Sequence, residues 1–345
     1  MKPEAQPMPE TPEPNRKGHS RRRWGRRLIG AALLALLIAL LDYYLFPYGS
    51  KPDGPTYNRG ENGLWLRYTW YFGKHSAAEV QQLARHLKER RIRNAYFHVR
   101  SITKAGTLQY RKEAEVRRLT SALHQAAPPV RLFAWVYVGN RRGQGEVDLS
   151  SPTVRQAMVK EAQWLVGSAG FDGVQWDYEI SDDGDPDFLS LLHETRTALP
   201  PQKQLSVATP MWLPGPLQRW GWSDGYFRLA AAQCDQMTVM CYDSGFWTPR
   251  SYVWLVRQQA LHVPQDAAQS AHNCRVLLGL PTYGDGFRSH NPRAENLRLA
   301  LRGVREGLHD PGAQLSTFEG VALFADYTTD DKDWQTYSDL WLTGR

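Results

Sequence analysis

The stretch "GFDGVQWDYEIS", residues 170–181, places polar side chains at every second position of a segment otherwise rich in β-forming residues. Successive side chains of a strand point to opposite faces. One face of this strand is therefore expected to carry the polar residues Gln175, Asp177 and Glu179. The other face carries Trp176 and Tyr178. Two acids on one face are costly to bury unless they are hydrogen-bonded or paired, so the segment is either a solvated edge strand or a strand inside a closed barrel.

The same unit, a strand-like segment followed by a helix-like one, recurs from residue 63 almost to the C-terminus. Besides residues 170–181, the expected strands are residues 63–70, 92–99, 130–138, 204–210, 236–243, 275–284 and 320–327. Eight such units in about 280 residues are typical of a (β/α)8 TIM barrel, an α/β fold. Because a closed barrel has no edge, this count favours the barrel interpretation. It also puts Glu179 at the C-terminal mouth, where such barrels have their active sites.

The N-terminal region predicts a membrane anchor. Residues 1–27 are rich in Pro, Glu and Arg and are expected to form a disordered cytoplasmic tail. Residues 28–48 are apolar and, as a helix, would span about 31 Å, enough to cross a hydrocarbon core of about 30 Å. The arginines before them place the N-terminus in the cytoplasm. The lipid bilayer is thus an expected partner of this signal-anchor helix, and a cleaved export signal is the alternative.

After residues 49–62, a linker, the barrel is expected over residues 63–345, outside the cytoplasm in the periplasm or at the cell surface. The net charge of the 345-residue chain is +7, but residues 1–50 hold eight Lys or Arg against four Asp or Glu. The barrel is therefore nearly neutral and has no basic stripe, which argues against nucleic acid as a partner. The ten histidines and three cysteines show no zinc-type spacing, and we expect neither a metal nor another cofactor.

Two of the cysteines, Cys234 and Cys274, precede the sixth and seventh strands near their N-terminal ends. Adjacent parallel strands lie about 4.8 Å apart, which is compatible with disulfide geometry. We therefore expect a Cys234–Cys274 disulfide in an oxidising compartment, with Cys241 as a buried thiol. The alternative is three separate buried thiols.

Three motifs resemble one known family. "DGVQWDYE" (residues 172–179) is similar to the D-G-x-x-x-D-x-E signature of the fourth barrel strand in glycoside hydrolase family 18, the chitinases and endo-β-N-acetylglucosaminidases. "MCYD" (residues 240–243) resembles the M-x-Y-D motif of strand six, and "GLPTYG" (residues 279–284) resembles a segment of strand seven. The resemblance covers roughly residues 60–343 and puts the three motifs on three matching strands.

The resemblance implies roles for individual residues. Glu179 would be the general acid and base. Asp177 would orient and stabilise the 2-acetamido group of the substrate, which itself attacks the anomeric carbon to give an oxazolinium intermediate. Tyr242 would hydrogen-bond that acetamido group, and Asp243 would bind a sugar hydroxyl. Met240, in the same motif, is assigned to substrate binding.

The sequence departs from the family pattern at two places. Gln175 stands where the family commonly has Asp, and it is assigned to the substrate site. An amide can hydrogen-bond Asp177 but cannot titrate, so a lower activity or a shifted pH profile is expected, and Gln175→Asp is expected to leave activity intact or raise it. The family Trp of strand eight, the floor of a sugar subsite, is not evident in "GVALFADY", where Tyr327 is the nearest aromatic residue.

Flat rings at strand ends are expected to cover the faces of sugar rings. The residues assigned to this role are Trp70, Tyr137, Trp212, Trp247 and Tyr283. The function that the resemblance implies is retaining, substrate-assisted hydrolysis of glycans that contain N-acetylglucosamine, such as peptidoglycan, exopolysaccharide or chitin-like polymers. The alternatives are a glycan-binding barrel without catalysis and a transglycosylase that uses the same site.

Overall fold

The computed structural model describes residues 17–46 and 54–343, with side chains from residue 24 onward. The chain divides into two compact units, Met1–Phe46 and Pro47–Arg345. The predicted tail up to residue 16, the end of the predicted membrane span after Phe46 and the first part of the predicted linker lie outside the described residues.

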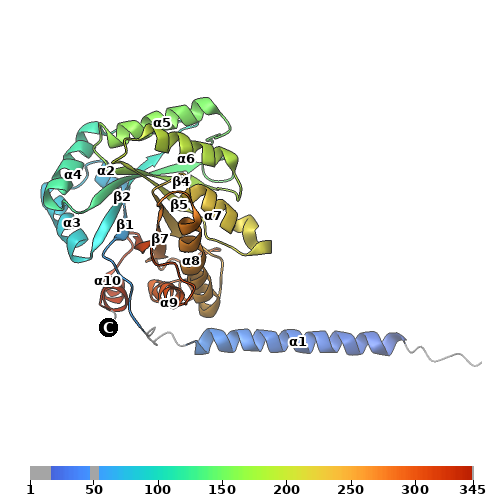
Figure 1. The fold of residues 1–345 in the computed structure, drawn as a ribbon. Helices are drawn as coiled ribbons and strands as arrows, with labels where there is room; N and C mark the ends of the chain where they lie inside the picture. Colours follow the sequence, from blue (N-terminus) through green and yellow to red (C-terminus); the bar gives the residue numbers. More distant parts are fainter. Residues whose placement is uncertain (1–16, 47–53, 344–345) are drawn as a thin grey trace, which may run out of the picture. The chain divides into compact units, whose positions relative to one another are not determined.

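Eight parallel strands close into a barrel, each paired with the next in chain order and the last paired with the first (Figure 1). Their bounds are β1 Asn62–Leu66, β2 Ile92–Ser101, β3 Arg131–Gly139, β4 Gly173–Glu179, β5 Gln204–Thr209, β6 Gln236–Met240, β7 Arg275–Pro281 and β8 Phe318–Phe324. This is the (β/α)8 TIM barrel that the sequence predicts.

Helices alternate with the strands and cover the outside of the barrel (Figure 1). Their bounds are α2 Tyr68–Tyr71, α3 Ala77–Glu89, α4 Glu113–Ala126, α5 Pro152–Val166, α6 Pro186–Ala198, α7 Asp224–Ala231, α8 Pro249–Gln269, α9 Leu297–Leu308 and α10 Asp331–Tyr337, with a short 3-10 helix η1 Gly215–Trp220 and a π-helical turn η2 Ser338–Leu342. Asp185 caps α6 by accepting hydrogen bonds from the N–H groups of Asp187 and Phe188, and Pro186 is the first helical residue.

The first strand is shorter than the sequence predicts. It ends at Leu66, not at Trp70, because the chain turns at Arg67, whose N–H donates to Asp326 Oδ1 at 3.1 Å. Residues from Tyr68 then form the one-turn helix α2. The sixth strand likewise ends at Met240, so that the last part of its motif lies in the loop beyond the strand.

The barrel interior is filled by two kinds of side chain. Near the N-terminal ends of the strands, Glu319 accepts hydrogen bonds from Gln236 Nε2 and from Arg131, both at 2.9 Å. Further toward the C-terminal ends of the strands lies a buried cluster, made of Trp65, Tyr96, Phe133, Trp135, Leu277, Ala322 and Ala325. A packed interior leaves the C-terminal mouth as the place for a site.

Helix α1, Lys17–Leu45, begins ahead of the predicted span, which started at Leu28. The arginines before Leu28 are good helix formers, and the helix extends over them from Lys17. Its segment Trp24–Leu45 has a mean hydropathy of 2.2 and is long and apolar enough to cross a membrane, as a membrane anchor or a signal sequence would be.

The predicted disulfide is wrong for this structure. Cys234, Cys241 and Cys274 are all buried free thiols. The sulfur atoms of Cys234 and Cys274 lie 3.7 Å apart, the distance of a thiol contact, whereas a disulfide bond is about 2.05 Å long. The alternative of three buried thiols is the one the structure contains.

Candidate active site at the mouth of the barrel

Strand β4 presents its two faces as the alternation predicts. The outward face meets helix α6, where Trp176 Nε1 donates to Thr195 Oγ1 at 3.1 Å and the ring of Tyr178 lies 5.1 Å from that of Phe188. The inward face therefore carries Gln175 and Asp177, which are buried, and Glu179, which is half-buried at the end of the strand.

Asp177 is 5% exposed, and only one of its two carboxylate oxygens has a hydrogen-bond partner among the described residues. Its Oδ2 accepts a hydrogen bond from Trp135 Nε1 at 2.8 Å. Its Oδ1 is buried and has no hydrogen-bond partner among the described residues. A buried carboxylate oxygen without a donor is costly in a folded protein, so this atom is available to a donor that a ligand brings.

The amide of Gln175 could hydrogen-bond Asp177 but does not do so in the structure. Its Oε1 accepts from Trp65 Nε1 at 2.8 Å. Its Nε2 donates to Ser206 Oγ at 3.1 Å and to Thr238 Oγ1 at 3.3 Å. The amide is fully used by these three partners inside the barrel, which explains why it does not turn toward the residue two positions on.

The loop between β3 and α5 holds the backbone around Glu179. The N–H of Asn140 donates to the Glu179 carbonyl at 3.0 Å, and the Asn140 side chain exchanges two hydrogen bonds with the backbone of Ile180. A methyl group on Gly143 would lie 2.3 Å from the Glu179 carbonyl oxygen, so only glycine permits this close approach. An open recess of about 370 Å³ next to Glu179 is lined by Tyr137, Arg142, Gly143, Gln144 and Ile180.

The pKa values of both acids are raised. For Asp177 the first cause is burial and the second is the negative charge of Glu179, while the hydrogen bond from Trp135 acts in the opposite direction. For Glu179 burial again comes first, followed by the negative charge of Asp243. For Glu179 the raised pKa keeps the carboxyl group protonated closer to neutral pH, which is the requirement for a general acid.

The loop after β6 carries Tyr242 and Asp243. Asp243 has φ +56°, a left-handed conformation that is uncommon for a residue other than glycine. Tyr283 donates its hydroxyl to Asp243 Oδ1 at 2.5 Å, and His290 Nδ1 lies 3.6 Å from the same atom. Met240, the last residue of β6, follows the inward-facing Gln236 and Thr238 by the same alternation and is half-buried.

Asp243, His290 and Glu295 have ligand-type atoms within 4.8 Å of one another. Glu295 is fully buried, and its carboxylate accepts hydrogen bonds from the N–H and hydroxyl of Ser244 and contacts His290 Nδ1 at 3.1 Å. These internal bonds fasten the loop after β7 to the loop after β6. The hydrogen bonds of these three residues therefore explain the group as a link that positions the two loops.

Phe324, not Tyr327, is the aromatic residue that β8 contributes to this group. Its ring stacks on Tyr242 at 4.9 Å with an interplanar angle of 25°, and it contacts Trp65 and Trp135 edge to face. Tyr327 is 44% exposed and lies under the Arg67 guanidinium. The sequence contained this signal, because counting by twos along β8 from the inward Ala322 selects residue 324.

The five predicted aromatic platforms have three different locations. Tyr137 and Tyr283 join the mouth: Tyr137 lines the recess beside Glu179, and Tyr283 bonds Asp243. Trp247 is 64% exposed in the loop between β6 and α8. The expectation for Trp70 and Trp212 is wrong, because their contacts hold them elsewhere.

Trp212 is buried between α7 and α8, where its ring stacks on His262 at 3.7 Å and its Nε1 donates to Asp224. Trp70 stacks on His75 at 3.6 Å, and its Nε1 donates to Asp326 Oδ2 at 3.1 Å. The Trp212 indole is held by α7, and the Trp70 indole is held by the loop after β8.

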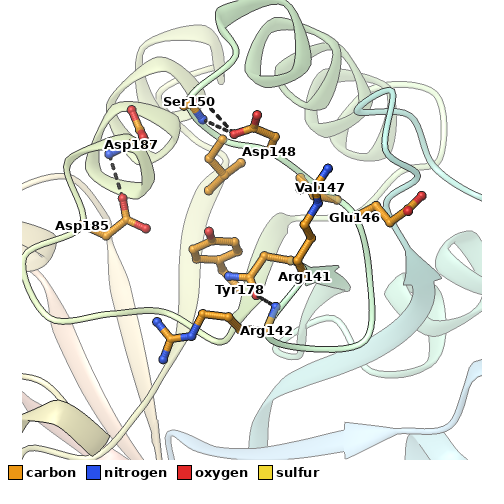
Figure 2. A pocket seen from close by; sticks show the side chains of 11 residues that line it. Arg141, Arg142, Glu146, Val147, Asp148, Ser150, Tyr178, Asp185 and Asp187 are labelled. Atoms are coloured by element: carbon orange, nitrogen blue, oxygen red, sulfur yellow. Dashed lines mark hydrogen bonds between the residues drawn. The ribbon is translucent and has the colours of Figure 1, made fainter.

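A second recess lies on the helix side of β4. It has a volume of about 380 Å³, and Figure 2 shows Tyr178 between Arg141 and Arg142 on one side and Asp185 and Asp187 on the other. Because Tyr178 faces away from the barrel interior, this recess is separate from the group around Asp177.

Comparison with solved structures finds the same barrel in glycan-degrading enzymes. The chitinase of Chromobacterium violaceum superposes with a TM-score of 0.56 at 16% identity, over 82% of this chain and 99% of that chain. The class V chitinase of Pseudomonas fluorescens gives 0.55 at 15% identity over 82% and 99%. The spore cortex-lytic enzyme SleL of Bacillus cereus gives 0.55 at 12% identity over 84% and 74%.

No protein-family model and no curated protein matches the sequence. At these identities the likeness to solved structures establishes the fold: the chain has the barrel of these chitinases and of the cortex-lytic enzyme.

Proposed function

We propose that the protein is a glycoside hydrolase of the family 18 type, which cleaves β-linked glycans containing N-acetylglucosamine with retention of configuration. The observation that carries the proposal is the pair of inward acids, Asp177 and Glu179, at the C-terminal mouth of β4. The shared barrel of chitinases and a spore cortex-lytic enzyme supports it.

Glu179 is the general acid in this proposal. Burial and the charge of Asp243 raise its pKa, so its carboxyl group holds a proton at higher pH than an exposed glutamate does. It gives this proton to the glycosidic oxygen as the bond from that oxygen to the anomeric carbon breaks. The recess lined by Tyr137 and Arg142 gives the departing sugar a way out.

The nucleophile is the acetamido oxygen of the substrate, which bonds the anomeric carbon to form an oxazolinium ion. Asp177 Oδ1, buried without a partner among the described residues, accepts the acetamido N–H and stabilises the positive charge that develops there. Glu179, now a carboxylate, then takes a proton from water, and the resulting hydroxide attacks the anomeric carbon from the face that the leaving group vacated. Two displacements retain the configuration.

Tyr242 and Phe324 complete the sugar site in this proposal. Burial and the neighbouring acids raise the pKa of Tyr242, so its phenol stays a donor, suited to the acetamido oxygen. The stacked ring of Phe324 forms an apolar floor for the sugar. Asp243, fixed by Tyr283, binds a sugar hydroxyl.

The apolar segment of α1 supports a location at a membrane. We propose that residues 28–48 act as an uncleaved signal-anchor and that the barrel acts outside the cytoplasm. This placement favours a polymer close to the membrane surface, such as peptidoglycan or an exopolysaccharide.

The test is product analysis with the full-length protein in detergent, using chitooligosaccharides, peptidoglycan and N-glycans. We expect shortened products whose new reducing ends are first released as the β-anomer, as early NMR spectra would show. An α-anomer at early times would contradict the mechanism. Binding without cleavage would favour the glycan-binding alternative, and lengthened products would favour the transglycosylase.

A further inference from the structure

Asp177 has an unusual set of neighbours for a buried acid. The described residues give it a single hydrogen bond, from Trp135 Nε1 at 2.8 Å. Gln175, which would be the nearest partner on the strand, is committed to Trp65, Ser206 and Thr238. Whatever orients the Asp177 carboxylate in the unliganded protein therefore acts through the indole of Trp135.

An indole N–H donates and never accepts a proton. A carboxyl group at position 175 could share a proton with Asp177, but Trp135 cannot. Its donation favours the carboxylate form and occupies Oδ2 alone, so that Oδ1 is left for the substrate. One indole thus offsets part of the rise in the pKa of Asp177 and determines which oxygen remains free.

The indole itself is immobilised. His98 stacks on the Trp135 ring at 4.1 Å, while Trp65 and Phe324 contact it edge to face at 6.5 and 5.9 Å. Burial and Arg100 lower the pKa of His98 to about 4, so this ring is neutral near neutral pH and adds no charge beside Asp177. A donor fixed by packing needs no reorganisation when charge develops on the substrate.

We infer that Trp135 is a positioning residue whose indole N–H fixes Asp177 so that Oδ1 meets the acetamido group of the bound sugar. The inference rests on the proposed function. It assigns to a strand-β3 tryptophan the task of orienting the acid on β4, in a chain whose Gln175 cannot perform it.

A pH effect follows from the same geometry. The titratable groups that face Asp177 are Glu179 on its own strand, Tyr137 on β3 and Tyr242 after β6, and His98 on β2 reaches it only through the Trp135 ring. Removing the Trp135 donor leaves the charges of these groups in place and takes away an interaction that lowers the pKa of Asp177. The acid limb of the activity profile then moves to higher pH.

Two substitutions separate donation from packing. Trp135→Phe keeps an aromatic ring and removes the donor, whereas Trp135→His removes the benzo ring and keeps an N–H two bonds beyond Cγ, where the indole has it. If donation to Asp177 matters, kcat ranks wild type, then His, then Phe. If Trp135 only fills space, Phe retains more activity than His.

The matched control is Trp176→Phe, which removes another buried indole hydrogen bond, to Thr195, on the face of β4 opposite to Asp177. We expect Trp135→Phe to lower kcat by about 10- to 100-fold, the usual effect of losing a partner that orients a catalytic group. KM should change little, the acid limb should move to higher pH, and Trp176→Phe should keep the wild-type profile.

All variants are tested as full-length protein, with melting curves to verify folding. Wild-type turnover is measured first, so failure of the proposed function shows as an inactive wild type, whereas failure of this inference shows only in the variants. Wild-type kcat and acid limb in Trp135→Phe, or higher activity in Phe than in His, would overturn the inference. If the Phe variant does not fold, a folded and inactive Trp135→His would overturn it alone.

Discussion

The N–H of Asn140 donates to the carbonyl of Glu179 at 3.0 Å, so the loop that follows β3 fixes the end of β4. The same loop brings Gly143 so close to Glu179 that a side chain there would collide with the backbone. The position of the proposed general acid thus depends on a neighbouring strand and on a glycine that carries no functional group.

Gly143→Ala should displace the end of β4. The added methyl group would lie 2.3 Å from the Glu179 carbonyl oxygen, and misplacement of a catalytic group by about 1 Å can cost on the order of 10²-fold in rate. We expect kcat to fall at least about tenfold. Gly225→Ala, in α7 with only ordinary contacts around the new methyl, is the control and should stay fully active.

Tyr283→Phe should weaken substrate binding more than turnover. The substitution removes the hydroxyl that donates to Asp243 at 2.5 Å, and a hydrogen bond to a charged group contributes about 1.5–3 kcal/mol. A rise in KM of roughly tenfold or more is expected from this loss. Tyr337→Phe, which removes a hydroxyl bonded to the Arg90 carbonyl, is the control. An unchanged KM in Tyr283→Phe would contradict a contribution of this hydrogen bond to substrate binding.

Gln175→Asp should lower stability and should not raise activity, although the family pattern leads one to expect activity that is intact or raised. The shorter carboxylate cannot donate to Ser206 and Thr238 as the Gln175 amide does, and it adds another acid to the interior of the barrel. Melting temperature and kcat of the variant decide between the two outcomes. Stability equal to wild type would show that the three amide hydrogen bonds contribute little.

Asp266 should make the protein less stable as pH rises. Burial and the charge of Asp224 raise its pKa to about 7, despite the ion pair with Arg228. Between the ordinary value near 4 and about pH 7, the folded protein holds a proton that the unfolded chain has released, so this contribution to stability is complete below about pH 4 and is lost as pH rises through about 7. Asp266→Asn should lessen the fall in Tm between pH 5 and pH 8 by several degrees.

The exposed Asp182 provides the comparison, because Asp182→Asn changes the same functional group outside the helix interface. If the fall in Tm is the same in wild type, Asp266→Asn and Asp182→Asn, the raised pKa of Asp266 has no effect on stability.

The sequence predicts the barrel because period-two alternation within strands and strand–helix alternation along the chain are local patterns. The same alternation predicts which side of β4 faces inward. It does not predict the partner of Asp177, because Trp135 comes from a neighbouring strand and competes with Gln175 for that role. The choice depends on Ser206 and Thr238, which draw the amide away.

The aromatic residues show both a position that the sequence predicts and positions that it does not. The alternation of side chains along β8 predicts that Phe324 faces inward, so the sequence contained enough to prefer it over Tyr327. Trp212 and Trp70 stand close to strand ends, yet Trp212 stacks on His262 of α8 and Trp70 stacks on His75 and donates to Asp326. Distance along the chain from a strand end does not specify the direction in which a loop turns.

The central claim is tested most directly by the turnover number of Glu179→Gln, measured on the glycan that the wild type cleaves. The amide keeps the shape of the side chain but has no transferable proton, so we expect kcat to fall by about 10²- to 10⁴-fold, the usual contribution of one positioned acid. Glu146→Gln, the same change at an exposed position of the loop after β3, should leave kcat unchanged. Undiminished turnover in Glu179→Gln would contradict the account.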